Sequence, residues 1–210
     1  MPRESRELTQ ARREEIVGAC ARLYETMGFR EVTIKEISAE TSFSRPSIYN
    51  YFETKEEIFL ALLQREYELW AEELERIPAE RKALCAEELA SVLAHTLEHR
   101  TLLLKIQAMN LYEIEDHSRL ERLEEFKRTF FRAMNAVDGC LAAFLPEMTE
   151  RERSDFRYSF FPFLYGVYPY AFPTGKQRAA MENAGIAYRP ASIYDLAYGC
   201  LKKLLQSGNS

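Results

Sequence analysis

Apolar residues recur at helical spacing along most of the chain. Near the N-terminus they follow a three- and four-residue spacing that places them on one face of a helix: Ile16, Ala19, Cys20, Leu23, Tyr24 and Met27. Gly28 is expected to end this helix. The two-residue alternation typical of half-buried strands does not occur, and no internal repeat is found. The pattern predicts an all-α protein.

Capping boxes mark where further helices begin. In such a box, a Ser or Thr hydroxyl and a carboxylate three residues later satisfy free backbone N–H groups. Boxes of this kind start at Thr33, Thr54, Ser118, Thr149 and Ser192. Together with the apolar spacing they predict about nine helices, including residues 33–40, 45–52, 54–77, 83–99, 101–115, 118–146 and 192–205, with Pro78 ending the fourth. Residues 173–190 are expected to form a long connection with a short helix inside.

Residues 33–55 read as a short helix, a turn at 41–44 and a second helix, which is the size of a helix-turn-helix. The residues expected to face inward are apolar: Ile34, Ile37, Phe43 and Ile48. The second helix offers hydroxyl, guanidinium, amide and phenol groups on its other faces. Such groups suit contacts to phosphates and base edges.

Residues 29–38 (FREVTIKEIS) and 44–59 (SRPSIYNYFETKEEIF) resemble the DNA-binding domain of the tetracycline-repressor (TetR) family. The Ile-Tyr-x-Tyr-Phe-x-x-Lys-Glu block is the most specific part of a similarity that covers about residues 9–70. The resemblance implies a dimeric DNA-binding regulator. Residues 1–55 would form the DNA-binding domain, helix 54–77 would link the domains, and residues 56–210 would bind an effector and dimerise.

The resemblance also implies roles for single residues. Thr33 matches a phosphate contact at a helix N-terminus, and Lys55 matches a lysine that binds the DNA backbone. The complete predicted DNA-binding set is Thr33, Ser44, Arg45, Pro46, Ser47, Tyr49, Asn50, Tyr51 and Lys55. Among these, Ser44, Arg45 and Ser47 match positions that reach base edges, and Tyr49 and Tyr51 match phosphate-binding tyrosines.

Two positions depart from the family pattern. Ser42 stands where the turn usually has Gly, and if that position needs a positive φ, Ser costs about 1 kcal/mol. Pro46 removes one N–H from the start of the second helix and stiffens it. We therefore expect an unusual base-reading pattern.

The charge balance limits how DNA can be held. The net charge of the 210-residue chain is −5, and residues 1–55 contain equal numbers of cationic and acidic side chains. A module without net positive charge binds DNA only if a few donors are well placed. Dimer geometry then has to contribute, with two reading helices on a palindrome whose half-sites are at least about 34 Å apart.

The C-terminal part predicts the dimer and the pocket. Its aromatic residues are too many for one helix face: Phe156, Tyr158, Phe160, Phe161, Phe163, Tyr165, Tyr168, Tyr170 and Phe172. With the last helix they fit the four-helix interface between two copies that the resemblance to the TetR family implies. An effector pocket is expected at Tyr67, Trp70, His99, Met109, Tyr112, Phe126, Phe130 and Tyr165. Its composition favours a hydrophobic or aromatic effector that releases a repressor from DNA.

Two other functions stay open at this stage. His95 and His99, with Glu98 beside them, match the H-x-x-E-H spacing of a zinc peptidase, but no third-ligand signature follows. The other alternative is an all-α interaction protein whose helix-turn-helix has lost DNA binding. Because no catalytic motif has further support, we expect no enzyme activity, no cofactor and no metal.

The remaining expectations concern location and cysteines. No apolar run approaches the roughly 20 residues that span a membrane, and residues 1–7 contain no apolar stretch typical of a signal peptide. The sequence therefore predicts a cytoplasmic protein without a membrane partner. The four cysteines, Cys20, Cys85, Cys140 and Cys200, lack metal-ligand spacing and are expected to be small reduced core residues.

Overall fold

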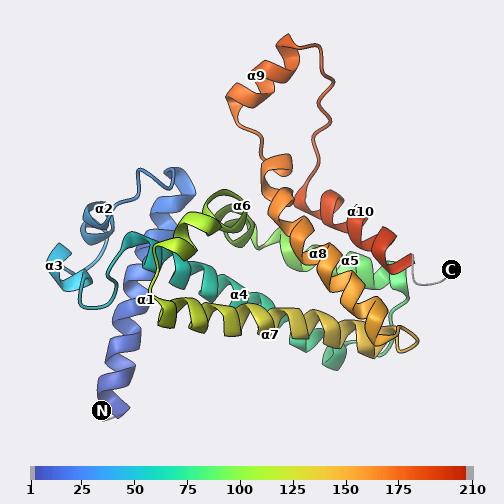
Figure 1. Cartoon of the computed structure of the whole chain (residues 1–210), viewed down its shortest axis with the longest axis horizontal. Coiled ribbons are helices and arrows are strands. Elements are labelled where there is room, and N and C mark those ends of the chain that lie inside the picture. The colour runs from blue at the N-terminus through green and yellow to red at the C-terminus, as the bar shows by residue number, and fades with distance from the viewer. Residues whose placement is uncertain (1–2, 207–210) are drawn as a thin grey trace. The chain divides into compact units, whose positions relative to one another are not determined.

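The computed structural model describes residues 3–206, and this part of the chain folds into ten α-helices without a strand (Figure 1). The predicted all-α class is confirmed. Residues 1–7 are the stretch in which no signal peptide is expected, and its first two residues, Met1 and Pro2, lie outside the described residues. The helices are α1 (Arg3–Thr26), α2 (Ile34–Ala39), α3 (Arg45–Ile48), α4 (Lys55–Glu80), α5 (Ala86–Glu98), α6 (Thr101–Asp116), α7 (Leu120–Phe144), α8 (Glu150–Ala171), α9 (Gly175–Asn183) and α10 (Ile193–Gln206).

The chain divides into two compact units. The first contains residues 1–66 and 110–130, and the second contains residues 67–109 and 131–210. Helices α4, α6 and α7 each begin in one unit and continue in the other. These units describe packing, whereas the boundary predicted at residue 55 separates functions and stays a prediction. No helix of the described chain is long and apolar enough to cross a membrane.

The core of the first unit joins the helix-turn-helix to α1 and to the first turns of α4. The predicted face of α1 is buried at Ile16, Ala19, Cys20 and Tyr24, while Leu23 and Met27 are half-buried. The ring of Phe59 lies 5.0 Å from the ring of Tyr24 and 4.7 Å from that of Phe29. Ile37, Ile48 and Phe52 are fully buried, so α2 and α3 rest on a rigid base.

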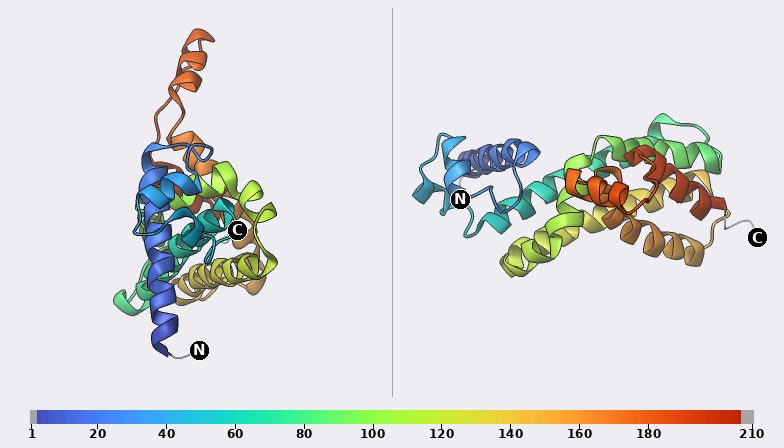
Figure 2. Two further views of the ribbon diagram at one scale, coloured as in Figure 1. Left: turned by 90° about the vertical axis from the view of Figure 1, so that its left-hand side faces the viewer. Right: turned by 90° about the horizontal axis from the view of Figure 1, so that it is seen from above.

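The core of the second unit contains α10 packed against α5 and α8. Helix α8 buries one face, made of Phe156, Phe160, Phe161, Leu164 and Val167, and α10 buries Ile193, Ala197, Leu201 and Leu205. The predicted short helix within the long connection is α9. It contains no buried residue and stands clear of α8 and α10 (Figures 1 and 2).

Pro78 does not end the fourth helix as predicted, because α4 continues to Glu80. A proline at this position cannot donate to the carbonyl four residues earlier, which is that of Leu74. The thiol of Cys140 donates to this carbonyl at 3.4 Å. The freed acceptor is therefore satisfied from α7, and the helix can pass through the proline.

Two other local predictions were wrong. Ser118 does not cap α7, because its hydroxyl donates to the carbonyl of Ile114 at 2.7 Å and so closes the end of α6. Cys85 is exposed rather than buried, because it lies at the N-cap of α5, where its N–H donates to Glu88 at 2.8 Å. Of the other cysteines, Cys20 and Cys140 are buried and Cys200 is half-buried.

Candidate nucleic-acid interface

The turn between α2 and α3 is fixed by side chains on both of its ends. The Ser38 hydroxyl donates to the carbonyl of Phe43 at 3.2 Å, and the Thr41 hydroxyl accepts from the Phe43 N–H at 3.4 Å. At the C-terminus of α2, the guanidinium of Arg22 donates to the carbonyl of Glu40 at 3.2 Å. Helix α1 thus satisfies an acceptor that the end of a helix leaves free.

Ser42 carries no backbone strain. Among the described residues no amino acid other than glycine has a positive φ, so the cost considered for Ser42 does not arise. The Ser42 N–H donates to the Glu15 carboxylate at 2.6 Å. This hydrogen bond holds the pKa of Glu15 below its usual range. The hydrogen bond to the Glu15 carboxylate of α1 therefore helps to fix the turn, which does not need the conformational freedom of a glycine.

Helix α3 is shorter than predicted and ends at Ile48. Beyond it, the N–H groups of Asn50 and Tyr51 donate to carbonyls three residues earlier, at 3.3 and 2.9 Å. This tighter bonding replaces the regular helix that was expected as far as residue 52. Pro46 lies in the first turn, where its missing N–H leaves no helical bond unmade.

The N-terminal end of α3 presents polar side chains outward. Ser44 is the N-cap residue, but its hydroxyl contacts the hydroxyl of Ser47 at 2.8 Å and caps no backbone N–H. Arg45 is exposed and forms no ion pair with the described side chains, those of residues 7–206. As far as the described residues show, its guanidinium is therefore available to a ligand.

The other side of α3 presents two tyrosines in different surroundings. Tyr49 is 45% exposed, and Asn50 beside it is exposed. Tyr51 is half-buried, with its ring 6.0 Å from that of Phe43 and its hydroxyl accepting from Arg12 at 3.1 Å. Tyr49 is thus free of the core, whereas Tyr51 also packs against the turn.

The two predicted backbone contacts outside α3 both have structural partners. Thr33 is exposed at the N-cap of α2, where its hydroxyl accepts from the Glu36 N–H at 3.4 Å. The ammonium of Lys55 donates to the carbonyl of Phe29 at 2.8 Å and lies 4.2 Å from the centre of the Phe29 ring. Lys55 therefore ties the first turn of α4 to the connection before α2, a role that the sequence did not indicate.

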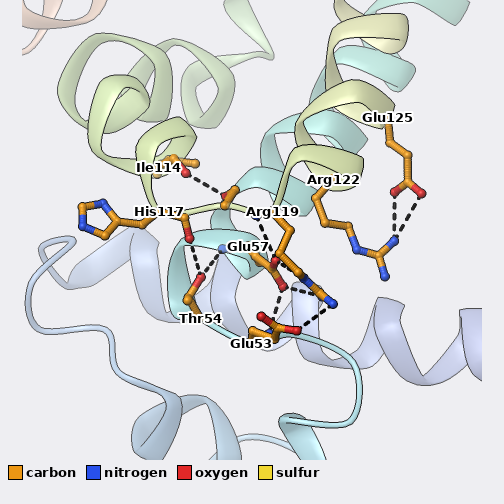
Figure 3. A network of polar contacts seen from close by, with 9 residues as sticks. Glu53, Thr54, Glu57, Ile114, His117, Arg119, Arg122 and Glu125 are labelled. Atoms are coloured by element: carbon orange, nitrogen blue, oxygen red, sulfur yellow. Dashed lines mark hydrogen bonds and ion pairs between the residues drawn. The ribbon is translucent and has the colours of Figure 1, made fainter.

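Sequence reasoning also missed a polar network between the α3–α4 turn and the α6–α7 turn (Figure 3). The Glu57 side chain is fully buried and accepts two hydrogen bonds from the Arg119 guanidinium, at 2.6 and 2.9 Å. Arg119 also pairs with Glu53 at 2.9 Å, and the Thr54 hydroxyl donates to the carbonyl of His117 at 3.1 Å. A charged pair 62 residues apart leaves no periodic signal in the sequence.

The network determines the charge state of Glu57. Burial alone would raise the pKa of this carboxyl, but hydrogen bonds from Arg119 and from the Glu53 N–H outweigh burial and lower it. Glu57 is therefore ionised near neutral pH. It holds the α6–α7 turn against the first turn of α4, directly after the predicted DNA-contacting segment.

The predicted effector residues are distributed over both compact units. Tyr112, Phe126 and Phe130 belong to the first unit, and Tyr67, Trp70, His99, Met109 and Tyr165 belong to the second. Tyr67, Trp70 and Phe126 are buried, whereas Tyr112 is 89% and Met109 57% exposed. The assignment of all eight to a pocket stays a prediction.

A cavity of about 650 Å³ opens in the second unit between the last turns of α4 and α5, and His95 and His99 line it. His95 Nδ1 bonds to the carbonyl of Ser91 at 2.7 Å, and its Nε2 lies 3.9 Å from the Glu98 carboxylate. The described residues contain no group of three or more His, Cys, Asp or Glu that could hold a metal ion. The H-x-x-E-H spacing therefore gains no further ligand from the fold.

Two family models match the chain. The model described as bacterial regulatory proteins, tetR family, matches residues 16–62, and the model described as tetracyclin repressor-like, C-terminal domain, matches residues 64–191. The first match contains α2, α3 and the start of α4, and the second contains the helices from α5 to α9.

Individual relatives agree with these matches. The helix-turn-helix-type transcriptional regulator YfiR of Bacillus subtilis is 32% identical over 63 residues, which make up 30% of this chain and 31% of that protein. The chain thus matches about a third of the length of this curated relative. The fatty acid degradation regulator FadR of Bacillus halodurans shares the fold at 17% identity, with a TM-score of 0.59 over 92% of this chain and 94% of that one. FadR of Bacillus subtilis, solved in complex with stearoyl-CoA, is 17% identical and has a TM-score of 0.59 over 91% of this chain and 96% of that one.

Proposed function

Because the chain belongs to the tetracycline-repressor (TetR) family and is thus a DNA-binding transcriptional regulator and not an enzyme, we propose that it is a repressor released from a palindromic operator by a small apolar effector. The observation that carries the proposal is the exposed polar row of α3. Arg45 on α3 and Tyr49 and Asn50 directly after it are exposed, while Ile48 at the end of the helix is fully buried. Side chains held in this way can contact DNA without disturbing the fold.

The proposed contacts divide by chemistry. Arg45, with Ser44 and Ser47 beside it, reads base edges, because a guanidinium can donate two hydrogen bonds to one guanine. Tyr49 and Thr33 bind phosphates through their hydroxyl groups. The remaining predicted residues, Pro46, Asn50, Tyr51 and Lys55, shape this surface or add backbone contacts. The functional division into residues 1–55 and 56–210 is part of the proposal.

A homodimer presents two such helices to a palindrome. The exposed face of α8 supports this: Tyr158, Pro162 and Tyr165 recur every three or four residues, opposite the buried face, and Phe172, directly after the helix, is exposed as well. At Gly166, an added Cβ would meet no described atom within 4 Å apart from its chain neighbours and its own helix backbone. Rows of aromatic residues left at the surface are typical of protein interfaces.

Release requires an effector that binds the two arrangements of the dimer with different affinity. In the proposed mechanism, the effector binds among α4 to α8, moves the long helix α4, and changes the spacing of the two reading helices. The complex of Bacillus subtilis FadR with stearoyl-CoA supports ligand control for this fold. Because its operator is genomic DNA, we place the protein in the cytoplasm.

The proposal is tested by selecting binding sites from a random pool of duplex DNA, followed by anisotropy measurements on the selected site. We expect an inverted repeat, and an affinity that falls with salt in proportion to the phosphates contacted. Arg45→Ala and Tyr49→Ala should each weaken binding about tenfold or more, since each removes a direct contact.

Tyr112→Ala provides the matched control, because this tyrosine is 89% exposed on α6 and lies outside the proposed surface. It should bind the selected site like the wild type. Failure to enrich any sequence would instead favour an interaction protein that has lost DNA binding. Undiminished binding by Tyr49→Ala would remove the proposed phosphate contact.

A further inference from the structure

The core of the second unit contains a side-chain amide whose oxygen is hydrogen-bonded and whose nitrogen is not. Gln107 lies on α6 and is 2% exposed, and its Oε1 accepts a hydrogen bond from the hydroxyl of Tyr67. Its Nε2 is buried and has no acceptor in the part of the chain that the structure describes. Buried polar groups are nearly always paired, so an unpaired donor at this depth calls for a functional explanation.

Aromatic side chains from α4 and α8 continue from this amide. The ring of Tyr67 lies 6.0 Å from that of Trp70, which in turn lies 6.0 Å from that of Phe161. The indole N–H of Trp70 already donates to the Thr96 hydroxyl at 2.9 Å. Next to this apolar wall, the Gln107 amide nitrogen is a buried donor without a partner in the described chain.

We propose that Nε2 of Gln107 donates to a neutral carbonyl oxygen of the effector, whose aromatic body packs against Trp70 and Phe161. The inference rests on the proposed function as a ligand-controlled regulator. It adds the class of ligand, an aromatic ketone, ester or amide, and the residue that recognises it.

The surroundings favour a neutral acceptor over a carboxylate. Burial raises the pKa of Tyr67 well above its usual value, and the nearby Tyr165 raises it further. A site that disfavours an anion on Tyr67 also disfavours an anionic ligand at the amide hydrogen-bonded to it. A carbonyl oxygen accepts the hydrogen bond without bringing a charge into the core.

The same residues connect the amide to the surface. Tyr67 interacts with Tyr165, which lies on α8 and is 41% exposed. Gln107, Tyr67 and Tyr165 thus form a polar row from the core of the unit to its surface.

The test uses the full chain and three probes of similar shape: acetophenone, α-methylstyrene, which has a CH₂ group in place of the carbonyl oxygen, and benzoate, which carries a charge. Dissociation constants are measured by titration calorimetry. We expect acetophenone to bind about tenfold more tightly than α-methylstyrene, the factor typical of one hydrogen bond, and more tightly than benzoate, whose charge is costly to bury. Equal binding of acetophenone and α-methylstyrene, or no binding of acetophenone, would overturn the proposal.

Variants identify the residue responsible. In Gln107→Leu the preference for acetophenone over α-methylstyrene should vanish. The double variant Tyr67→Phe with Gln107→Leu should lose the preference in the same way, and it leaves no unpaired Tyr67 hydroxyl in the core. Thr96→Val is the matched control, because it removes a buried hydrogen bond that is satisfied within the protein. It should keep the preference. If Gln107 only holds a structural water, the variants will lose stability while the wild type shows no preference.

Failure of the inference can be told apart from failure of the proposed function. Wild-type protein and Gln107→Leu are both tested for binding to selected DNA without a probe, and both should bind equally. If neither binds any DNA, the proposed function fails whatever the probes do. If both bind DNA and the three probes bind alike, only the assignment of Gln107 fails.

Discussion

Several polar side chains around α3 have partners within the protein as well as a surface to offer to DNA. Arg12 donates to the Tyr51 hydroxyl, and Lys55 donates to the Phe29 carbonyl. In contrast, Arg45 is exposed and Tyr49 is 45% exposed, and neither side chain has a polar partner among the described residues. Substitutions in the first pair therefore change stability together with binding, while substitutions in the second pair test binding alone.

Lys55→Met removes the ammonium and keeps most of the apolar stem. We expect the free energy of unfolding to fall by about 1–2 kcal/mol, because one hydrogen bond and one cation–π contact are lost. Urea unfolding measures the change, and Lys55→Arg, which keeps a cation over Phe29, should recover part of it. An unchanged unfolding midpoint in Lys55→Met would show that these contacts do not stabilise the fold.

At the scale of elements, the α2–α3 turn depends on a bond from α1 rather than on a special backbone conformation. Ser42 has no positive φ, and its N–H is held by Glu15. Ser42→Gly, which restores the family's usual residue, should therefore lower the free energy of unfolding by about 0.5–1 kcal/mol, because glycine loses more chain entropy on folding. Thermal and urea unfolding decide the matter, and a more stable glycine variant would contradict this account.

The pair of Glu57 and Arg119 joins two turns and should make stability depend on pH. The pKa of Glu57 is lowered in the fold, so its contribution is complete above the pKa of the unfolded chain, about 4.3, and is lost as the pH falls through the lower folded value. At pH 7, Glu57→Gln should cost about 1.5–3 kcal/mol of unfolding free energy, the range for hydrogen bonds to charged groups.

The difference between wild type and Glu57→Gln should shrink below a pH of about 4, where the wild-type carboxyl takes up a proton. Urea titrations at several pH values measure it. Glu25→Gln, at an exposed position of α1, should show little difference from wild type at any pH. A Glu57→Gln penalty that stays constant down to pH 3 would mean that shape, and not charge, holds the two turns together.

At the scale of the whole molecule, the exposed aromatic row of α8 is proposed to bind a second copy. Tyr158 is 77% exposed in the single chain, so Tyr158→Glu should leave its fold intact while placing a charge in the interface. We expect the dissociation constant of the dimer, measured by analytical ultracentrifugation, to rise about tenfold or more. Operator affinity should fall with it, whereas Tyr112→Glu should change neither. An unaltered dimer would place the interface elsewhere.

The sequence by itself determined the all-α class, most helix positions and the helix-turn-helix, because apolar spacing and helix caps are local signals. Thr33, Thr149 and Ser192 accept the N–H three residues on, as predicted. Family membership also followed from a local block, residues 48–56. These features depend on neighbours within about four positions, which the chain order supplies directly.

Only the tertiary structure decided which polar groups meet across long separations. It paired Glu57 with Arg119, satisfied the Leu74 carbonyl with Cys140, and left Nε2 of Gln107 without a partner in the described chain. It also showed that Met109 and Tyr112 are exposed, although a thioether and a phenol are side-chain types that suit an apolar pocket. Such outcomes depend on which helices pack together and in which rotation. A hydrophobic stripe specifies that a face is buried but does not specify its partner.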